Sequence, residues 1–441
     1  MNYIPISEQD RKEMLEVVGV TAPTDLFVDV PEGALLKEPL NLDEGLSEYE
    51  LSRKLNDLAQ RNIPSSDIIS FAGAGCYDHY IPSFVDHIIS KPEFFTAYTP
   101  YQPEVSQGTL QAVYEYQTDI CNLTGLELSN ASMYDGATAL VEAAFMAHRL
   151  GKKRDTVLVS GGIHPQYIET LETYARPTPI KLTYGEVVNG VDDFDALENQ
   201  IDASCAAVVV GYPNYFGTVQ DFRKLAEKAH EKGALVIVVA NPMMLALLEA
   251  PGNLGADVVV GDAQVFGNSM SYGGPGLGYF ACTKKCMRQM PGRIVGATVD
   301  EDGHRGYVLT LSTREQHIRR EKATSNICSN HALNALAAGA YLAGVGKQGL
   351  KDVALTCVSK AHYLYNELIN TQKFSALNQE PFGYEFALNF EGERDSFYEY
   401  CVERNIIPGV REGNQSLIFA VTEKTSKAEL DAFVTEVARY E

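Results

Sequence analysis

The sequence is poor in basic residues and lacks long apolar runs. Its 58 acidic and 36 basic residues give a formal net charge of -22, so the surface repels phosphate backbones and anionic membrane faces. The longest apolar run, from Leu235 to Leu248, is interrupted by Asn241 and Pro242 and is too short to cross a bilayer. We therefore expect neither a nucleic-acid partner nor a membrane span.

The chain also has few cysteines and no leader-like start. Residues 1–10 contain neither a basic segment nor an apolar core, so we predict no signal peptide and a cytoplasmic protein. Eight cysteines in 441 residues are too sparse for a disulfide scaffold and fit a reducing compartment. Because Cys282 and Cys286 have no histidine partner at zinc-site spacing, we expect buried thiols and no metal site.

Residues 130–280 alternate apolar strand-like runs with helix-length segments. This alternation is typical of a parallel sheet that is covered by helices on both faces. The predicted strands are 156–160, 206–210, 235–239 and 257–260, and the predicted helices are 137–150, 222–232 and 242–249. The sequence therefore predicts a large α/β domain.

The two ends of the chain have different patterns. Ser7 and Asp10 form a capping signal before a short helix that stops at Gly19, and a second helix is expected at 47–62. The predicted elements after residue 350 are helices at 353–370 and 427–438 and strands at 384–390 and 417–421. We therefore predict an N-terminal extension at 1–70, a large domain at 71–345 and a small α+β C-terminal domain at 346–441.

One helix start could bind an anion. Asp135 directly precedes a predicted helix, so the backbone N–H groups of Gly136, Ala137 and Thr138 could form a phosphate cup. The alternative is an ordinary helix start that is capped by Asp135. His164 follows the first predicted strand, where it could stack on a bound ring or have only a structural role.

Two segments have no clear periodicity. Residues 93–111 mix tyrosine, proline and glutamine, which predicts a shaped loop that forms either a site wall or a rigid surface turn. Residues 311–328 place four basic and two acidic side chains beside polar residues. This second segment is either a solvated helix with salt bridges or a polar network at a site mouth or subunit contact.

Several motifs together resemble the P-protein family of the glycine cleavage system, glycine dehydrogenase (decarboxylating), and within it the subunit 1 of organisms that split the enzyme in two. The motifs are Tyr3–Pro5, Phe71–Pro82, Glu93–Gln111, Ser129–Ala139, Pro291–Gly296 and Arg314–Cys328. The resemblance implies a pyridoxal phosphate (PLP) dependent transferase of fold type I, similar to aspartate aminotransferase, with a mainly parallel sheet in the large domain. The small α+β domain would complete this fold.

Lysine is absent between Gly233 and Thr283, and the resemblance makes this absence informative. In the family, the lysine that binds the cofactor lies on subunit 2, shortly before a glycine-rich turn. Matching that turn to Gly273–Gly278 places Gln264 at the lysine position, and an amide cannot form an imine. The acid that pairs with the pyridinium nitrogen is also missing, because the corresponding strand ends at Asn241.

The resemblance also implies partners and a division of labour. Two copies of this chain and two of subunit 2 would form a heterotetramer, in which subunit 2 holds PLP, glycine is decarboxylated, and the aminomethyl group passes to the lipoyl arm of H-protein. We expect this chain to have no self-contained catalytic residue. The residues expected to form the wall of the partner's site are Tyr98, Thr99, Tyr101, Gln102 and Gln107. The residues expected to form a relict cofactor pocket are Asp135, Gly136, Ala137, Thr138 and His164.

Two other functions are compatible with the sequence. The chain could be a non-catalytic scaffold that only stabilises subunit 2. It could also be a self-sufficient PLP aminotransferase or decarboxylase that uses Lys284 or Lys285, although both lysines follow the glycine-rich turn instead of preceding it.

Overall fold

The computed structural model describes residues 5–36, 38, 40–152 and 154–441. These residues belong to two compact units that divide between Ile63 and Pro64. Tyr3 and Ile4, which belong to the first resemblance motif, lie outside the described residues. Within the described part of the chain, no helix combines the length and apolar character that a membrane span requires. The domain limits predicted at residues 70 and 345 stay predictions.

The N-terminal unit contains two capped helices and no buried side chain among its described residues. In α1 (Glu8–Val18), Ser7 Oγ accepts from Asp10 N, and the Asp10 carboxylate accepts from Ser7 N. The same reciprocal capping begins α2 (Glu48–Ala59), and short 3-10 turns lie between the two helices. Both predicted helices are therefore present, but they have no hydrophobic core within this unit.

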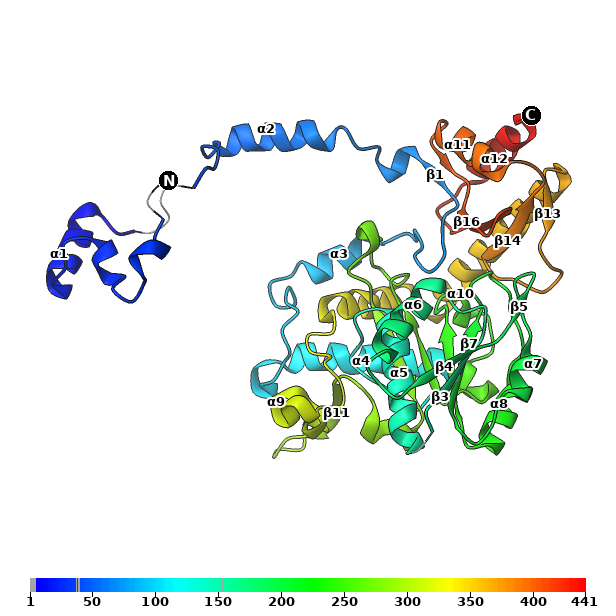
Figure 1. Cartoon of the computed structure of the whole chain (residues 1–441), viewed down its shortest axis with the longest axis horizontal. Helices are drawn as coiled ribbons and strands as arrows, with labels where there is room; N and C mark the ends of the chain where they lie inside the picture. The colour runs from blue at the N-terminus through cyan, green and yellow to red at the C-terminus, as the bar shows by residue number, and fades with distance from the viewer. Residues whose placement is uncertain (1–4, 37, 39, 153) are drawn as a thin grey trace. The chain divides into compact units, whose positions relative to one another are not determined.

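A seven-stranded sheet organises the second unit, with the strand order β2-β10-β9-β8-β7-β3-β4. Figure 1 labels its strands β3, β4 and β7. The strands are β2 (Leu128–Ser129), β3 (Thr156–Val159), β4 (Lys181–Tyr184), β7 (Cys205–Tyr212), β8 (Leu235–Ala240), β9 (Val258–Asp262) and β10 (Gly278–Cys282). The five strands from β9 to β4 are parallel, whereas β10 is antiparallel to both of its neighbours. The predicted mainly parallel sheet is therefore confirmed.

Both faces of the sheet are buried under helices. The longer helices of this part of the chain are α3 (Ser83–Ile89), α4 (Gln107–Thr124), α5 (Gly136–Gly151), α6 (Pro165–Ala175), α7 (Phe194–Asn199), α8 (Arg223–Glu231) and α10 (Ala332–Asn370). Along β7, Ala207 and Val209 join the core beneath α5 and α6, while Val208 and Val210 join the core on the other face. This alternation follows from the two-residue repeat of a strand.

The C-terminal part contains an antiparallel sheet of four strands in the order β13-β14-β17-β16. Its elements are β13 (Phe374–Ala376), β14 (Glu385–Phe390), α11 (Arg394–Val402), β16 (Val410–Glu412), β17 (Ser416–Ala420) and α12 (Lys427–Arg439). Helix α10 leads into this part and is kinked at Gly346, where φ is 63°. The predicted limit between the large and small domains falls at this kink.

Three small pairings complete the fold. Strand β1 (Ile69–Ser70) runs parallel to β15 (Ile406–Ile407), which ties the start of the second unit to the C-terminal part. The two hairpins pair β5 (Val187–Val188) with β6 (Val191–Asp192) and β11 (Ile294–Val299) with β12 (Arg305–Thr310). The β11–β12 hairpin lies against α4, which carries the end of the segment at 93–111.

The helix predicted at 242–249 is wrong. The segment contains only a 3-10 turn, Met244–Ala246, because Asn241 Oδ1 accepts from the backbone N of Met243 and Met244 and so bends the chain tightly. Its apolar residues are core contacts, since Met243 and Met244 are both buried. The apolar run therefore reflects burial and not helical periodicity.

The prediction of a loop over 93–111 is wrong for its last five residues. Helix α4 begins at Gln107, and Leu110 within it is buried. The second unpatterned segment, 311–328, contains only short helical turns, including α9 (Gln316–Arg319). Arg314 and Glu315 of this segment are buried. This burial favours the polar-network interpretation over a solvated helix.

Candidate functional site

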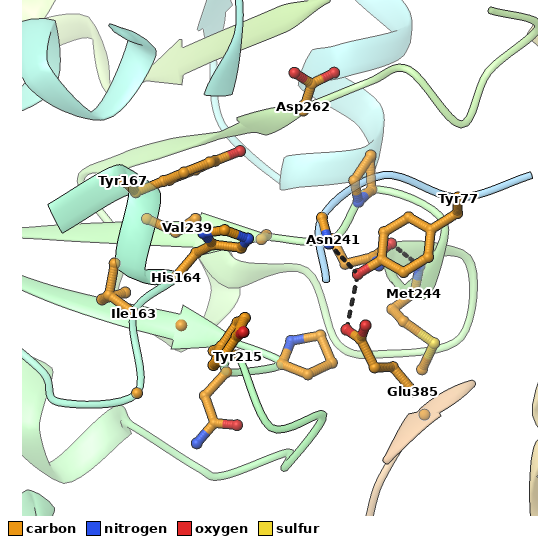
Figure 2. A pocket seen from close by; sticks show the side chains of 18 of the residues that line it. Tyr77, Ile163, His164, Tyr167, Tyr215, Val239, Asn241, Met244, Asp262 and Glu385 are labelled. Atoms are coloured by element: carbon orange, nitrogen blue, oxygen red, sulfur yellow. Dashed lines mark hydrogen bonds between the residues drawn. The ribbon is translucent and has the colours of Figure 1, made fainter. Parts of the chain in front are cut away.

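A cavity of about 80 Å³ lies where β7, β8 and β9 end, at the edge of the sheet where α/β folds bind ligands. Figure 2 shows its wall, to which the loop after β1, the start of α6 and the C-terminal part all contribute. The residues with polar side chains that line it include Tyr77, His164, Tyr167, Tyr215, Asn241, Asp262, Tyr384 and Glu385. We call this cavity the relict pocket.

Gln264, the residue at the expected lysine position, is buried and fully hydrogen-bonded. Its Oε1 accepts from Tyr77 N at 3.1 Å, and its Nε2 donates to the backbone oxygens of Tyr77 at 3.1 Å and Asn268 at 2.7 Å. No lysine is among the described residues that line the relict pocket. The amide therefore fastens the loop after β1 to the turn after β9, which is a structural task.

Asn241 stands at the position expected for the acid that pairs with the pyridinium nitrogen, and its side chain is also hydrogen-bonded. Its Nδ2 donates to the hydroxyl of Tyr384 at 2.6 Å, and its Oδ1 accepts from Met243 N at 3.1 Å. A neutral amide of this kind cannot stabilise a cationic ring nitrogen as a carboxylate would.

The predicted phosphate cup is the capped start of α5. Thr138 N donates to Asp135 Oδ1 at 2.7 Å, and Gly136 N donates to Asp262 Oδ2 at 3.3 Å. Ala137 lies in the same first turn. A Cβ atom on Gly136 would lie 1.9 Å from the hydroxyl oxygen of Tyr167, so the space beside this helix start is already taken.

The carboxylate of Asp262, at the end of β9, lies at the start of α5, where the predicted phosphate cup would hold its anion. It accepts from the backbone N of Gln264 at 2.9 Å and of Leu277 at 3.1 Å, in addition to Gly136. Burial raises the pKa of this carboxyl group, while the three N–H donors oppose that rise. A phosphate at this helix start would meet the charge of Asp262, so the site disfavours a second anion.

His164 lines the relict pocket and begins α6. Its Nδ1 accepts from Gln166 N at 3.1 Å, and its Nε2 lies 2.8 Å from the oxygen of Ala74. These contacts assign the proton to Nε2, and burial lowers the pKa of the ring. The ring meets Tyr215 edge-on, with centroids 5.0 Å apart. Both ring nitrogens of His164 are therefore used in hydrogen bonds to the backbone.

Glu385, the first residue of β14, closes the pocket from the C-terminal part. Its carboxylate accepts from Ala74 N at 2.6 Å and from the Tyr77 hydroxyl at 2.8 Å (dashed in Figure 2). Burial raises the pKa of Glu385 to about 7, although both hydrogen bonds oppose the rise. With no lysine, no pyridinium acid and two carboxyl groups inside, the residues present do not fit pyridoxal phosphate.

Sequence reasoning missed Asp262, Glu385 and the tyrosines of the pocket. An acid at the end of a buried strand, two residues before Gln264, was a signal for Asp262. No local signal marks Glu385, because it meets Tyr77 across 308 positions of sequence.

The five predicted wall residues fall into two groups. Tyr98 is 86% exposed and Tyr101 is 50% exposed, and both lie with Thr99 and Gln102 on the irregular segment before α4. Gln107, by contrast, lies in α4, and its side chain bonds the backbone of Tyr307 through both amide atoms, at 2.9 Å each. Four of the predicted wall residues therefore lie on one segment, whereas the side chain of Gln107 has a structural role.

The architecture is that of PLP-dependent enzymes of fold type I. The model matches a sphingosine-1-phosphate lyase of Burkholderia pseudomallei K96243 with a TM-score of 0.67 and 16% identity over 92% of this chain and 93% of that chain. It matches a glutamate decarboxylase of Lactobacillus brevis with a TM-score of 0.68 and 13% identity over 92% and 95%. The predicted fold class is confirmed.

Residues 1–437 match the model of the glycine cleavage system P-protein, and the chain belongs to this family. It is 48% identical to a probable glycine dehydrogenase (decarboxylating) subunit 1 of Listeria innocua and 46% identical to one of Bacillus mycoides, each over 99% of this chain and 98% of the relative. A crystal structure of glycine decarboxylase (P-protein) in inhibitor-bound form matches with 41% identity and a TM-score of 0.92 over 100% of both chains. The resemblance to P-protein subunit 1 is confirmed.

Proposed function

We propose that this chain completes the active site of a partner subunit in a glycine-decarboxylating enzyme and binds no cofactor itself. The partner, subunit 2, holds PLP, and two copies of each subunit form the enzyme. When bound there, PLP supplies the electron sink for the loss of carbon dioxide from glycine. The aminomethyl group then passes to the lipoyl arm of H-protein in the cytoplasm.

The observation that carries this proposal is the internal bonding of the relict pocket. Gln264 is held by three hydrogen bonds, and Asp262 accepts from three backbone N–H groups. A pocket that awaited a cofactor would keep donors free for the phosphate. Here the fold satisfies those groups itself, so the cofactor belongs elsewhere.

Exposed apolar side chains support a partner. Helix α2 exposes Leu51, Leu55 and Leu58, and the segment before α4 exposes Phe95 and Tyr98. Exposed apolar residues in such number on one chain are typical of surfaces that a second protein covers. The curated relatives are named as subunit 1, which supports a second kind of subunit, and the family's name supports H-protein as a partner.

The geometry argues against a self-sufficient enzyme that uses Lys284 or Lys285. Lys285 pairs with Asp257, which directly precedes β9, whereas Asp262 at the other end of that strand lines the relict pocket. Five residues of strand span roughly 16 Å, well beyond the reach of a lysine side chain. Lys284 is the neighbouring residue, and its side chain is likewise too short to reach the relict pocket.

Reconstitution tests the proposal. We expect glycine-carboxyl exchange with bicarbonate, in the presence of H-protein, from the mixture with subunit 2 and not from this chain alone. Borohydride reduction in the presence of PLP should leave no adduct on the isolated chain. An adduct together with unaided turnover would overturn the proposal.

A second measurement separates a site wall from a pure scaffold. Tyr98→Phe keeps the ring and removes the hydroxyl, and Tyr174→Phe is the matched control on α6, where Tyr174 is 40% exposed. Assembly with reduced turnover in Tyr98→Phe alone supports a wall role. Unchanged turnover in both variants supports the scaffold.

A further inference from the structure

A second cavity, of about 30 Å³, lies apart from the relict pocket. It is enclosed by α4, the β11–β12 hairpin, the segment at 94–100 and the start of α10. Most of its wall is apolar, with Phe94, Val113, Val295 and Leu309 among the lining residues. Polar side chains also reach the wall, and two of them, Arg293 and Tyr116, carry buried atoms that have no hydrogen-bond partner among the described residues.

Arg293 is only 4% exposed, and among the described residues only its Nη2 makes hydrogen bonds. Its Nε lies 2.9 Å from Glu315 Oε2, and its Nη2 donates to the Tyr101 hydroxyl at 2.8 Å. Its Nη1 is buried and has no hydrogen-bond partner among the described residues, and the same holds for its Nε and for both carboxylate oxygens of Glu315, which pair by charge without hydrogen-bond geometry. Since bulk water does not reach Nη1, the structure leaves a guanidinium donor unsatisfied.

Tyr116, another residue of the cavity wall, also carries a polar group that is unpartnered within the described chain. The side chain is 1% exposed, and its hydroxyl has no hydrogen-bond partner in the described part of the chain. A buried polar group without a partner costs about 1–3 kcal/mol, and two such groups line one small cavity. A ligand that accepts hydrogen bonds from both would remove both costs.

The charge near Arg293 favours an anionic ligand. Arg314, which is 9% exposed, donates from Nη2 to Gly292 O at 3.1 Å, so a second guanidinium bonds the backbone of the residue before Arg293. Glu315 is the carboxylate that pairs with this group. His317, with Nδ1 3.9 Å from Glu315, adds no negative charge. Two cations and one anion leave this end of the cavity with a net positive charge.

We propose that the second cavity binds a small carboxylate anion of one or two carbons, such as formate, bicarbonate or acetate. A cavity of about 30 Å³ holds about two water-sized groups, which matches the two oxygens of a carboxylate. One oxygen accepts from Arg293 Nη1 and the other from the Tyr116 hydroxyl, while the carbon end meets the apolar wall. This proposal does not depend on the partnership proposed above.

Binding to the purified full-length chain, and to its mixture with subunit 2, tests the proposal. The probes are formate, bicarbonate and acetate in isothermal calorimetry, with chloride at equal ionic strength as the reference anion. Pivalate, which carries the same charge on a bulkier body, should not bind. We expect binding of the three small carboxylates and none of chloride.

Two conservative variants locate the binding. Tyr116→Phe and Arg293→Lys should each weaken binding by roughly 10-fold or more, because each removes a hydrogen bond to a charged group. Tyr114→Phe on the same helix and Arg305→Lys on β12 are the matched controls outside the cavity and should bind as the wild type does. Equal binding in Tyr116→Phe and Tyr114→Phe, binding of pivalate, or a crystal structure in acetate with only water in the cavity would each overturn the proposal.

Discussion

The relict pocket and the second cavity are both enclosed by the second unit, but their polar groups are used differently. In the relict pocket, Tyr77 bonds Glu385 and Gln264 bonds Tyr77. In the second cavity, Arg293 Nη1 and the Tyr116 hydroxyl are buried without partners among the described residues. This difference fits the two proposals, in which the relict pocket binds no cofactor and the second cavity binds a small anion.

The comparison also explains what the missing lysine does to the fold. A lysine at position 264 would need a charge partner or an imine, whereas the amide of Gln264 donates and accepts at once. The chain therefore has a cross-link between Tyr77 and the turn after β9 at the position that we propose for the lost lysine.

The largest expected effect comes from returning an amine to the relict pocket. Gln264→Lys removes three hydrogen bonds and buries an ammonium group, so we expect a loss of at least about 3 kcal/mol of unfolding free energy. Because Asp262 still occupies the anion position, the variant should form no borohydride-reducible adduct with PLP. Urea unfolding and mass spectrometry after reduction measure the two outcomes.

Gln348→Lys is the matched control, since Gln348 is exposed on α10 and bonds only Asp352, one turn away. Its unfolding free energy should stay within about 0.5 kcal/mol of the wild-type value. A Gln264→Lys variant that binds PLP at wild-type stability would show that the pocket is still open.

The second expected effect is a pH dependence that arises from Glu385. Its pKa is about 7 in the folded chain against a reference value of 4.5, so the folded state binds the proton more tightly than the unfolded state. Stability therefore falls as the pH rises from 4.5 to about 7, by about 3 kcal/mol in total. Glu385→Gln cannot titrate and should lose this part of the pH dependence in urea unfolding between pH 5 and pH 8.

Glu142 supplies a comparison outside the pocket. Burial raises its pKa to about 7 as well, but it lies in α5 beside Arg149 and makes no contact with Tyr77. In Glu142→Gln, the contribution from Glu385 should remain. If Glu385→Gln keeps the full wild-type slope, the carboxylate is not the proton-linked group of the relict pocket.

The sequence predicted the framework of this molecule well because its strands are local apolar runs. The strands expected at 156–160 and 235–239 are present as β3 and β8, and the helix expected at 427–438 is α12. The capping signal at Ser7 also predicted a helix start correctly, because the bonds that form it span three residues. Periodicity and caps act over one or two turns of chain, and a sequence shows them directly.

The rest could not be predicted because it depends on contacts between distant residues. The run at 242–249 is apolar enough for a helix, but burial of Met243 and the turn set by Asn241 decide its shape. The pairing of Tyr77 with Glu385 and the burial of Arg293 against Glu315 join residues from separate elements. The expectation that Gln264 takes the lysine position did not reveal its bonds to Tyr77 either.

The smallest effect, a pair of tyrosine variants, compares the two cavities most directly. Both Tyr77 and Tyr116 are buried, and Phe keeps the ring of each. Tyr77→Phe removes the bond from its hydroxyl to Glu385 at 2.8 Å, so it should cost about 1–2 kcal/mol of unfolding free energy. Tyr116→Phe removes a hydroxyl that has no partner in the described structure, so without added carboxylate it should leave stability unchanged or raise it by up to about 1 kcal/mol. Urea unfolding in chloride buffer measures both, and equal losses in the two variants would mean that the second cavity is as fully bonded as the relict pocket.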